Sequence, residues 1–311
     1  MSRRNVAIDG SDSGKASTAT VVGSLLDPAT ETDRERRRVV LLCLPYFLLA
    51  TFGAFVPLAV MARMSVSTDR FANVGFTSEA WRTLVTDPIY REIALNTLWF
   101  AAATTVFSVA CGVVLSHVLA TYDLPFERAI VSIVSFPIAL PVIVVAFMIV
   151  VLLGRTGLVT NAIAVFTGRS PIDLASARSL LGLFLGYVFS LIPRSTMVLR
   201  GTFAEVDEAT REAARALGAS PLAAFYHVVL PQVWPGIVAA LVLTFRTALA
   251  IFGTVLVLPA LNVATLRIDL EIQDLGFNSQ IAGAIGLVYF LFLFVVTFGG
   301  LKLIDDEYLR I

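Results

Sequence analysis

Charged residues are scarce in this chain. Asp, Glu, Lys and Arg make up 15% of its 311 residues, whereas soluble proteins contain about 25%. Hydrophobic residues make up 57%, and the formal net charge is zero. The lack of a basic excess argues against a general nucleic-acid binder. The composition therefore predicts a membrane protein.

Cysteine and histidine are almost absent. Cys43 and Cys111 both lie in apolar runs, which indicates small buried hydrophobic residues rather than a disulfide or metal site. His117 and His227 are distant in sequence from any cysteine or acidic cluster. We therefore expect ordinary polar contacts for both histidines and predict no metal site.

A nucleotide-binding motif is also missing. The nearest candidate is the stretch 10–16, GSDSGKA, which is one residue shorter than a phosphate-binding loop. It lacks Ser or Thr after Lys15 and follows no predicted strand. We therefore expect no ATPase site, no cofactor and no enzymatic activity in this chain.

The chain contains many long apolar runs. About 20 apolar residues suffice for a helix to cross a bilayer. We predict membrane spans at 39–61, 94–120, 129–153, 180–200, 236–258 and 282–304. The first run is too long for the apolar core of a signal peptide, so we expect it to be retained. The sequence predicts an all-α, polytopic protein with a disordered cytoplasmic tail, 1–38, and a transmembrane domain, 39–311.

The distribution of positive charge indicates which loops face the cytoplasm. Arg34 and the three residues Arg36 to Arg38 precede the first apolar run. With this cluster included, thirteen Lys or Arg lie in the segments that six spans place on its side of the membrane, against eight on the opposite side. We therefore expect both termini and the segment 203–235 to be cytoplasmic.

The segment 203–235 is polar and helical in pattern, and it separates the fourth and fifth runs. Asp207 is a suitable N-cap for a helix, with Glu208 in the first turn, where the helix dipole favours negative charge. Gly218 suits the left-handed position that follows a helix. The pattern predicts a short helix that ends just before this glycine.

A second short helix is predicted directly after the first. Ser220 is a suitable N-cap and Pro221 suits the first helical position. We expect this helix to run to Val229 and to stop before Pro231, because proline disfavours the α conformation in the residue ahead of it. The segment is therefore predicted to be a helix–glycine–helix unit.

This unit resembles the EAA motif of permease subunits in ATP-binding-cassette importers, whose pattern is EAA-x3-G-x9-I-x-L-P. The matching residues are Glu212, Ala213, Ala214, Gly218, Leu230 and Pro231. Val228 replaces the isoleucine of the pattern, which is a mild departure. An ordinary cytoplasmic hairpin would not require these residue types at these offsets.

The resemblance implies that the second short helix is a coupling helix that docks into a groove on a cytoplasmic ATPase subunit. We expect Phe225, Tyr226 and Val229 to supply apolar contacts there, because aromatic residues commonly dominate interfaces. The complete expected coupling site is Glu212, Ala213, Ala214, Gly218, Pro221, Phe225, Tyr226, Val229, Leu230 and Pro231.

The resemblance also implies a type I importer in the bacterial cytoplasmic (inner) membrane. Its expected partners are two ATPase subunits that carry ATP and Mg²⁺, a second permease subunit of a different chain, and an external substrate-binding protein. The stretch 217–221, LGASP, is more similar to permeases for polyamines, phosphonates, sulfate or molybdate, ferric ion and thiamine than to sugar permeases. A small charged solute is therefore expected.

Three residues at membrane depth are candidates for the pathway. Arg246 lies near the middle of the fifth run, where a charged side chain should face the bundle interior or a wet cavity. It fits either a structural role or a pathway role that favours an anionic group on the solute. Pro137 and Pro141 interrupt the third run, which indicates either a pathway or a structural kink.

An ion-coupled secondary transporter or a channel is the alternative function. Such proteins commonly place ionisable residues at membrane depth as relays or ion sites. No Asp or Glu falls within any of the six apolar runs. A membrane scaffold without transport activity would leave the EAA unit unexplained, so the sequence favours an importer permease.

Overall fold

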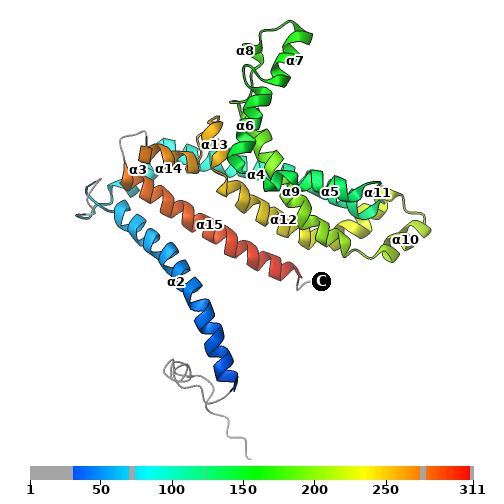
Figure 1. Ribbon diagram of the computed structural model, residues 1–311, viewed down its shortest axis with the longest axis horizontal. Coiled ribbons are helices and arrows are strands. Elements are labelled where there is room, and N and C mark those ends of the chain that lie inside the picture. Colours follow the sequence, from blue (N-terminus) through cyan, green and yellow to red (C-terminus); the bar gives the residue numbers. More distant parts are fainter. Residues whose placement is uncertain (1–30, 70–73, 123, 274–277, 309–311) are drawn as a thin grey trace, which may run out of the picture. The chain divides into compact units, whose positions relative to one another are not determined.

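The computed structural model describes residues 31–69, 74–122, 124–273 and 278–308, and the regular structure within these ranges is helical (Figure 1). Residues 1–30 of the predicted tail, with its GSDSGKA stretch, lie outside the described residues, whereas residues 31–38, predicted to be disordered, are helical. The chain divides into two compact units, 1–60 and 61–311. Each unit is described by itself.

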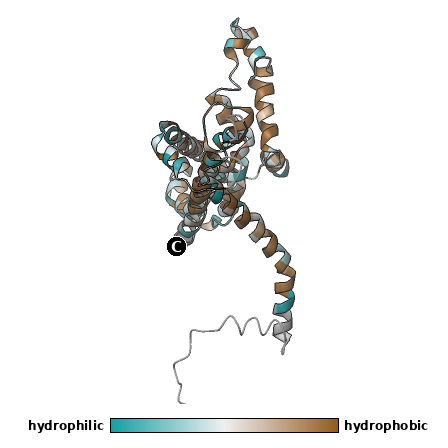
Figure 2. Cartoon of the chain, turned by 90° about the vertical axis from the view of Figure 1, so that its left-hand side faces the viewer, coloured by the Kyte–Doolittle hydropathy of each residue, from teal (hydrophilic) through white to brown (hydrophobic). Residues whose placement is uncertain are grey.

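The described part of the first unit belongs to the long helix α2 (Glu31–Ser65). None of its most apolar window is buried, and most of its residues are hydrophobic (Figure 2). Cys43 is exposed on it, so the prediction that this cysteine is buried is wrong within this chain. An apolar helix of this length is long enough to cross a bilayer.

The second unit contains the remaining helices of the described chain. In order they are α3 (Glu79–Thr86), α4 (Pro88–Thr121), α5 (Glu127–Ser135), α6 (Val142–Leu153), α7 (Leu158–Thr167), α8 (Pro171–Leu174), α9 (Leu180–Ala204), α10 (Glu208–Ala216), α11 (Pro221–Ala224), α12 (Leu230–Ala250), α13 (Gly253–Val257), α14 (Ala264–Gln273) and α15 (Ser279–Tyr308). Six helical stretches of the described chain are long and apolar enough to cross a membrane. The prediction of an all-α protein with six membrane helices is confirmed.

Small residues bring α4 and α9 close together along their lengths. A Cβ on Gly112 would lie 2.6 Å from Ser195 Oγ, so only glycine fits there. The Ser195 hydroxyl donates to the carbonyl of Ser108 at 2.9 Å, and the Ser116 hydroxyl donates to the carbonyl of Thr196 at 3.0 Å. Small side chains and hydroxyl bonds of this kind are typical of helix contacts in membranes. The pair forms the centre of the unit, against which α12 packs.

Two of the predicted spans are discontinuous. The run 129–153 consists of α5, a 3-10 helix (Phe136–Ala139) and α6, because the backbone is extended at Leu140 and Pro141 (ψ 133° and 136°). By length and apolarity alone, the stretch that qualifies in this region is Val142–Thr167. The run 236–258 is likewise divided, since α12 ends at Ala250 and α13 follows an extended Ile251. The first break was predicted from its prolines and the second was not.

Candidate functional site

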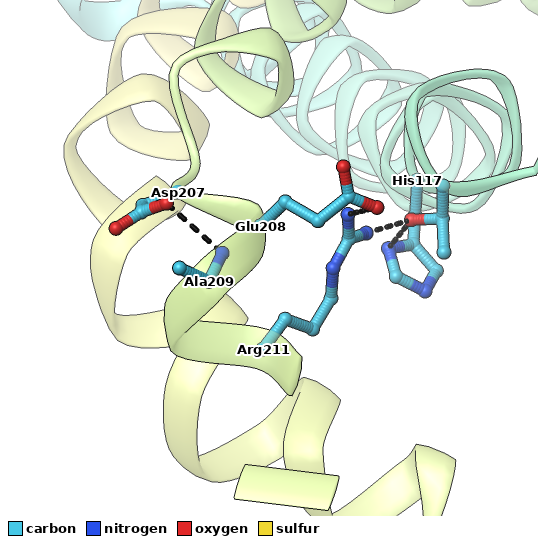
Figure 3. Close-up of polar contacts among 6 residues, drawn as sticks. His117, Asp207, Glu208, Ala209 and Arg211 are labelled. Carbon is cyan, nitrogen blue, oxygen red and sulfur yellow. Dashed lines mark hydrogen bonds and ion pairs between the residues drawn. The ribbon is translucent and has the colours of Figure 1, made fainter. Parts of the chain in front are cut away.

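The first helix of the EAA unit forms as its sequence predicts. Asp207 caps α10, and its Oδ1 accepts the backbone N–H of Ala209 at 3.0 Å (Figure 3). Glu208 occupies the first turn, and its carboxylate approaches Arg211 at 3.5 Å. Both side chains place negative charge at the positive end of the helix dipole, which stabilises the start of α10.

Gly218 ends α10 in the left-handed conformation, with φ +89°. Its N–H donates to the carbonyl of Arg215 at 2.9 Å, and the N–H of Ala219 donates to the carbonyl of Ala214 at 3.1 Å. These two bonds define a Schellman motif, which turns the chain sharply out of the helix. A residue with a Cβ would cost roughly 1 kcal/mol or more at this backbone angle. The predicted role of Gly218 in the backbone is confirmed.

The second helix starts as predicted but does not stop before Pro231. Ser220 Oγ accepts the N–H of Ala223 at 3.2 Å, and Pro221 is at the first helical position. The helix then passes from α11 through a π-turn (Phe225–Val229) into α12, so that 221–250 is helical throughout. In a regular α-helix the ring of Pro231 would press on the carbonyl four residues earlier. The wider i→i+5 turn relieves this contact, which explains the wrong prediction.

The side chains of the coupling helix divide into an inward and an outward set. Val229 is 1% exposed and packs with Leu199 and Phe203, so it holds the unit in place and is not available for docking. Leu222 and Tyr226 are 67% and 57% exposed and lie one helical turn apart. Together they form an outward apolar patch. Sequence reasoning missed Leu222, although its i,i+4 spacing to Tyr226 was a usable signal.

The other predicted coupling residues belong to the same helix–turn–helix unit. Glu212, Ala213, Gly218, Pro221 and Pro231 are exposed, whereas Ala214, Phe225 and Leu230 are half-buried. All ten predicted residues therefore lie in one short segment, and they differ in how far their side chains are exposed.

A polar link ties this unit to the end of α4 (Figure 3). Arg211 donates through Nη1 to Thr121 Oγ1 at 2.7 Å, and the same hydroxyl lies 3.2 Å from His117 Nδ1. The Arg211 side chain is largely buried by this contact. Because α4 packs closely against α9, the link connects the coupling unit to this central helix pair.

Aromatic packing and one ion pair surround this link. The His117 ring lies 4.7 Å from the Phe225 ring and 5.8 Å from the Phe203 ring, measured between centroids. Arg200 donates through Nη2 to Glu127 Oε1 at 2.8 Å, which joins the end of α9 to the start of α5. The inward face of the coupling helix is thus held by α4 and α9 together.

Removing the link should weaken coupling without unfolding the permease. We expect Arg211→Ala and Thr121→Val each to lower solute-stimulated ATP hydrolysis by the assembled transporter about tenfold or more, because hydrogen bonds to charged groups contribute about 1.5–3 kcal/mol. The double variant should be little worse than either single variant, with an interaction energy of about 0.5–3 kcal/mol. Arg215→Ala, on the same helix but exposed, is the matched control. Strictly additive effects would contradict a direct link.

Arg246 lies deep in the membrane part of α12. The Tyr289 hydroxyl donates to the carbonyl of Leu249, close to the end of this helix. Tyr289 is ten residues into α15, about 15 Å from its start, so α12 ends near the middle of the bilayer. The Arg246 side chain is exposed and makes no hydrogen bond or ion pair with any described residue. The structural alternative for Arg246, in which it pairs with a group on a neighbouring span, therefore has no support among the described residues.

The two breaks in the spans meet beside the end of α12. A Cβ on Gly253 would lie 3.2 Å from the backbone N of Ile143, which places the start of α13 against the start of α6. The break in the third span lies at Leu140 and Pro141, and Pro141 is exposed. Pro137 is buried in the 3-10 helix before this break. Interrupted helices at membrane depth form solute sites in other transporters. The break at Pro141 and the break after Arg246 are thus adjacent.

Comparison with known proteins gives the same assignment. Residues 108–309 match the family described as binding-protein-dependent transport system inner membrane component. The sulfate transport system permease protein CysT of Salmonella typhimurium is 26% identical over 263 residues, which cover 82% of this chain and 92% of CysT. The molybdate/tungstate permease protein WtpB of Thermococcus kodakarensis is 28% identical over 211 residues, 68% of this chain and 76% of WtpB.

Solved structures confirm the fold. A chain of a bacterial ABC transporter that imports the acidic polysaccharide alginate superposes with a TM-score of 0.73 at 17% identity, over 88% of this chain and 98% of that chain. The likeness confirms the polytopic helical architecture predicted from the sequence. With the family match, it shows that this chain belongs to the inner-membrane components of binding-protein-dependent transport systems and is a permease subunit of an ATP-binding-cassette importer.

Proposed function

We propose that this permease conducts a tetrahedral oxyanion, such as sulfate or molybdate, and that Arg246 faces its pathway. The observation that carries the proposal is the guanidinium of Arg246 near the middle of the bilayer, which pairs with none of the described residues. A charged residue at this depth costs about 2.5–3.5 kcal/mol on insertion scales, so it should face protein or water rather than lipid. Relatives that carry sulfate and molybdate support this solute class.

The chemistry of arginine favours an anion over the cationic solutes that the sequence left open. Its planar guanidinium offers paired N–H donors that match two oxygens of a tetrahedral anion. A polyamine at the same position would meet an uncompensated positive charge. Of the solute classes named above, the oxyanions are therefore the ones that fit Arg246.

The assembly that we propose contains this chain, a second permease subunit of a different sequence, two ATPase subunits that bind ATP and Mg²⁺, and an external binding protein. This chain supplies no ATPase site, and both termini face the cytoplasm of the bacterial inner membrane. The exposed patch of Leu222 and Tyr226 supports docking to an ATPase subunit. The uncovered face of α12 around Arg246 supports contact with a second permease subunit across the pathway.

Coupling follows from the continuity of the helix. Because 221–250 is helical throughout, a displacement of α11 by a closing ATPase dimer reaches Arg246 without an intervening loop. The distance along this helix from Leu222 to Arg246 is about 36 Å. We propose that the π-turn and Pro235 let this helix bend while the docking end and the pathway end stay connected.

Uptake of labelled solutes into cells that produce the complete importer tests the proposed solute class. Sulfate and molybdate should each accumulate well above the level in cells that lack the permease, and spermidine should not. Cells that produce the permease without its ATPase subunits are the control. Accumulation of spermidine, with no accumulation of either oxyanion, would contradict the proposal.

A further inference from the structure

An apolar groove lies at the end of the second unit that is remote from the coupling loop. Its volume is about 490 Å³, and its walls come from α3, α4, α14 and α15. The principal wall residues are Trp81, Leu84, Ala94, Leu98, Val288 and Phe292. The C-terminal end of α4 bonds to Arg211 of the coupling loop, whereas the groove lies along the first three turns of α4. The groove is therefore in the leaflet that faces away from the ATPase subunits.

The groove extends through one leaflet and no further. Along α4 it reaches from Tyr90 to Leu98, a rise of about 12 Å, which is less than half of a hydrocarbon core of about 30 Å. On the other wall it reaches Phe292, near the middle of α15. Leu98 and Val288 are both exposed, so the groove opens to its surroundings. A membrane-spanning helix crosses both leaflets, so this half-depth groove suits a single acyl chain better.

Charge is placed where a phosphate group would lie. Arg91 lines the shallow end of the groove, is exposed, and makes no hydrogen bond or ion pair with any described residue. Asp87, one turn earlier, directs its carboxylate to the N–H of Ile89 at 3.0 Å. Trp81 lies at the same end and donates its indole N–H to Ser65 Oγ at 3.2 Å. A cation and an amphipathic ring above an apolar slot are typical of the membrane interface.

We propose that this groove binds a phospholipid of the outward leaflet, with one acyl chain between α4 and α15 and the phosphate against Arg91. The residues behind the chain also fix α14. Tyr90 donates its hydroxyl to Glu271 Oε1 at 3.0 Å, and Thr97 Oγ1 accepts the N–H of Ala264 at 2.9 Å. A bound lipid would pack against Tyr90 and Thr97 and so support the outward connection between α13 and α15.

A photoreactive residue at Leu98 identifies what fills the groove. Benzoylphenylalanine is introduced at this position in the complete importer, which is irradiated in vesicles of phosphatidylethanolamine and phosphatidylglycerol. The proposal expects permease whose intact mass has increased by that of one phospholipid. A crosslink to a second polypeptide, or the absence of any adduct, would overturn it.

Two matched pairs of variants test the binding site by native mass spectrometry of the importer with added phosphatidylglycerol. Ala94→Trp fills the groove and should abolish lipid retention, whereas Leu95→Trp, exposed on the same helix outside the groove, should not. Arg91→Gln should weaken retention about fivefold, since a basic residue near anionic lipid contributes about 1 kcal/mol. Arg82→Gln, exposed on α3 outside the groove, should leave it unchanged. Equal retention within both pairs would contradict the proposal.

Discussion

Replacing Leu222 with aspartate is expected to abolish solute-stimulated ATP hydrolysis while the permease still inserts and folds. The Leu222 side chain is 67% exposed on α11, so the change should have little effect on stability. In a docked complex the same carboxylate would be buried in an apolar groove without a partner, which is strongly unfavourable. Truncating a central anchor of an interface commonly costs 2 kcal/mol or more, which is about thirtyfold in affinity.

Two control variants separate docking from folding. Phe76→Asp changes another exposed apolar residue, in the loop before α3 and remote from the coupling unit, and should leave ATP hydrolysis normal. Val229→Asp places a charge at a buried position and should destabilise the permease itself. The measurement is ATPase co-purification together with the hydrolysis rate. Full binding and stimulation with Leu222→Asp would show that this surface is not the docking site.

Arg246→Ala is expected to reduce oxyanion uptake at least tenfold, with assembly and basal ATP hydrolysis intact. The side chain has no described partner within the chain, so its removal breaks no internal hydrogen bond. Arg246→Lys keeps the charge but loses the paired donor geometry, and uptake should be intermediate. Transport is measured in proteoliposomes with the loaded binding protein outside.

The matched control for this prediction is Arg194→Lys in α9. Arg194 is half-buried and donates to the carbonyl of Ser190 on its own helix, so it has a structural partner. Its replacement should change stability more than solute selectivity. Normal uptake by both Arg246 variants would remove this residue from the pathway.

The parts of the coupling unit that sequence predicted correctly are those that local backbone chemistry decides. Asp207 and Ser220 each accept a hydrogen bond from a backbone N–H within four residues, and Gly218 turns the chain out of α10. Their roles therefore depend on little beyond the local sequence. The stop before Pro231 was predicted from the same kind of rule and failed. That rule describes a regular helix, and a π-turn offered another solution.

Contacts between segments far apart in the chain could not be predicted from the sequence. Thr121 and Arg211 are 90 residues apart, and no spacing rule relates them. The burial of Val229 depends on Leu199 and Phe203 at its back, so helix periodicity could not tell which face of α11 and the π-turn is free. The discontinuity after Ala250 likewise lies where two distant segments meet, since Gly253 closely approaches Ile143 of α6.

ATP-driven accumulation of an oxyanion in proteoliposomes tests the central claim most directly. The complete importer is reconstituted with its ATPase subunits facing a compartment supplied with ATP and Mg²⁺, and the loaded binding protein is added on the opposite side. The account predicts accumulation above equilibrium that requires both ATP and the binding protein and that Leu222→Asp abolishes. Accumulation driven by a proton or sodium gradient in the absence of ATP would contradict it and identify an ion-coupled transporter.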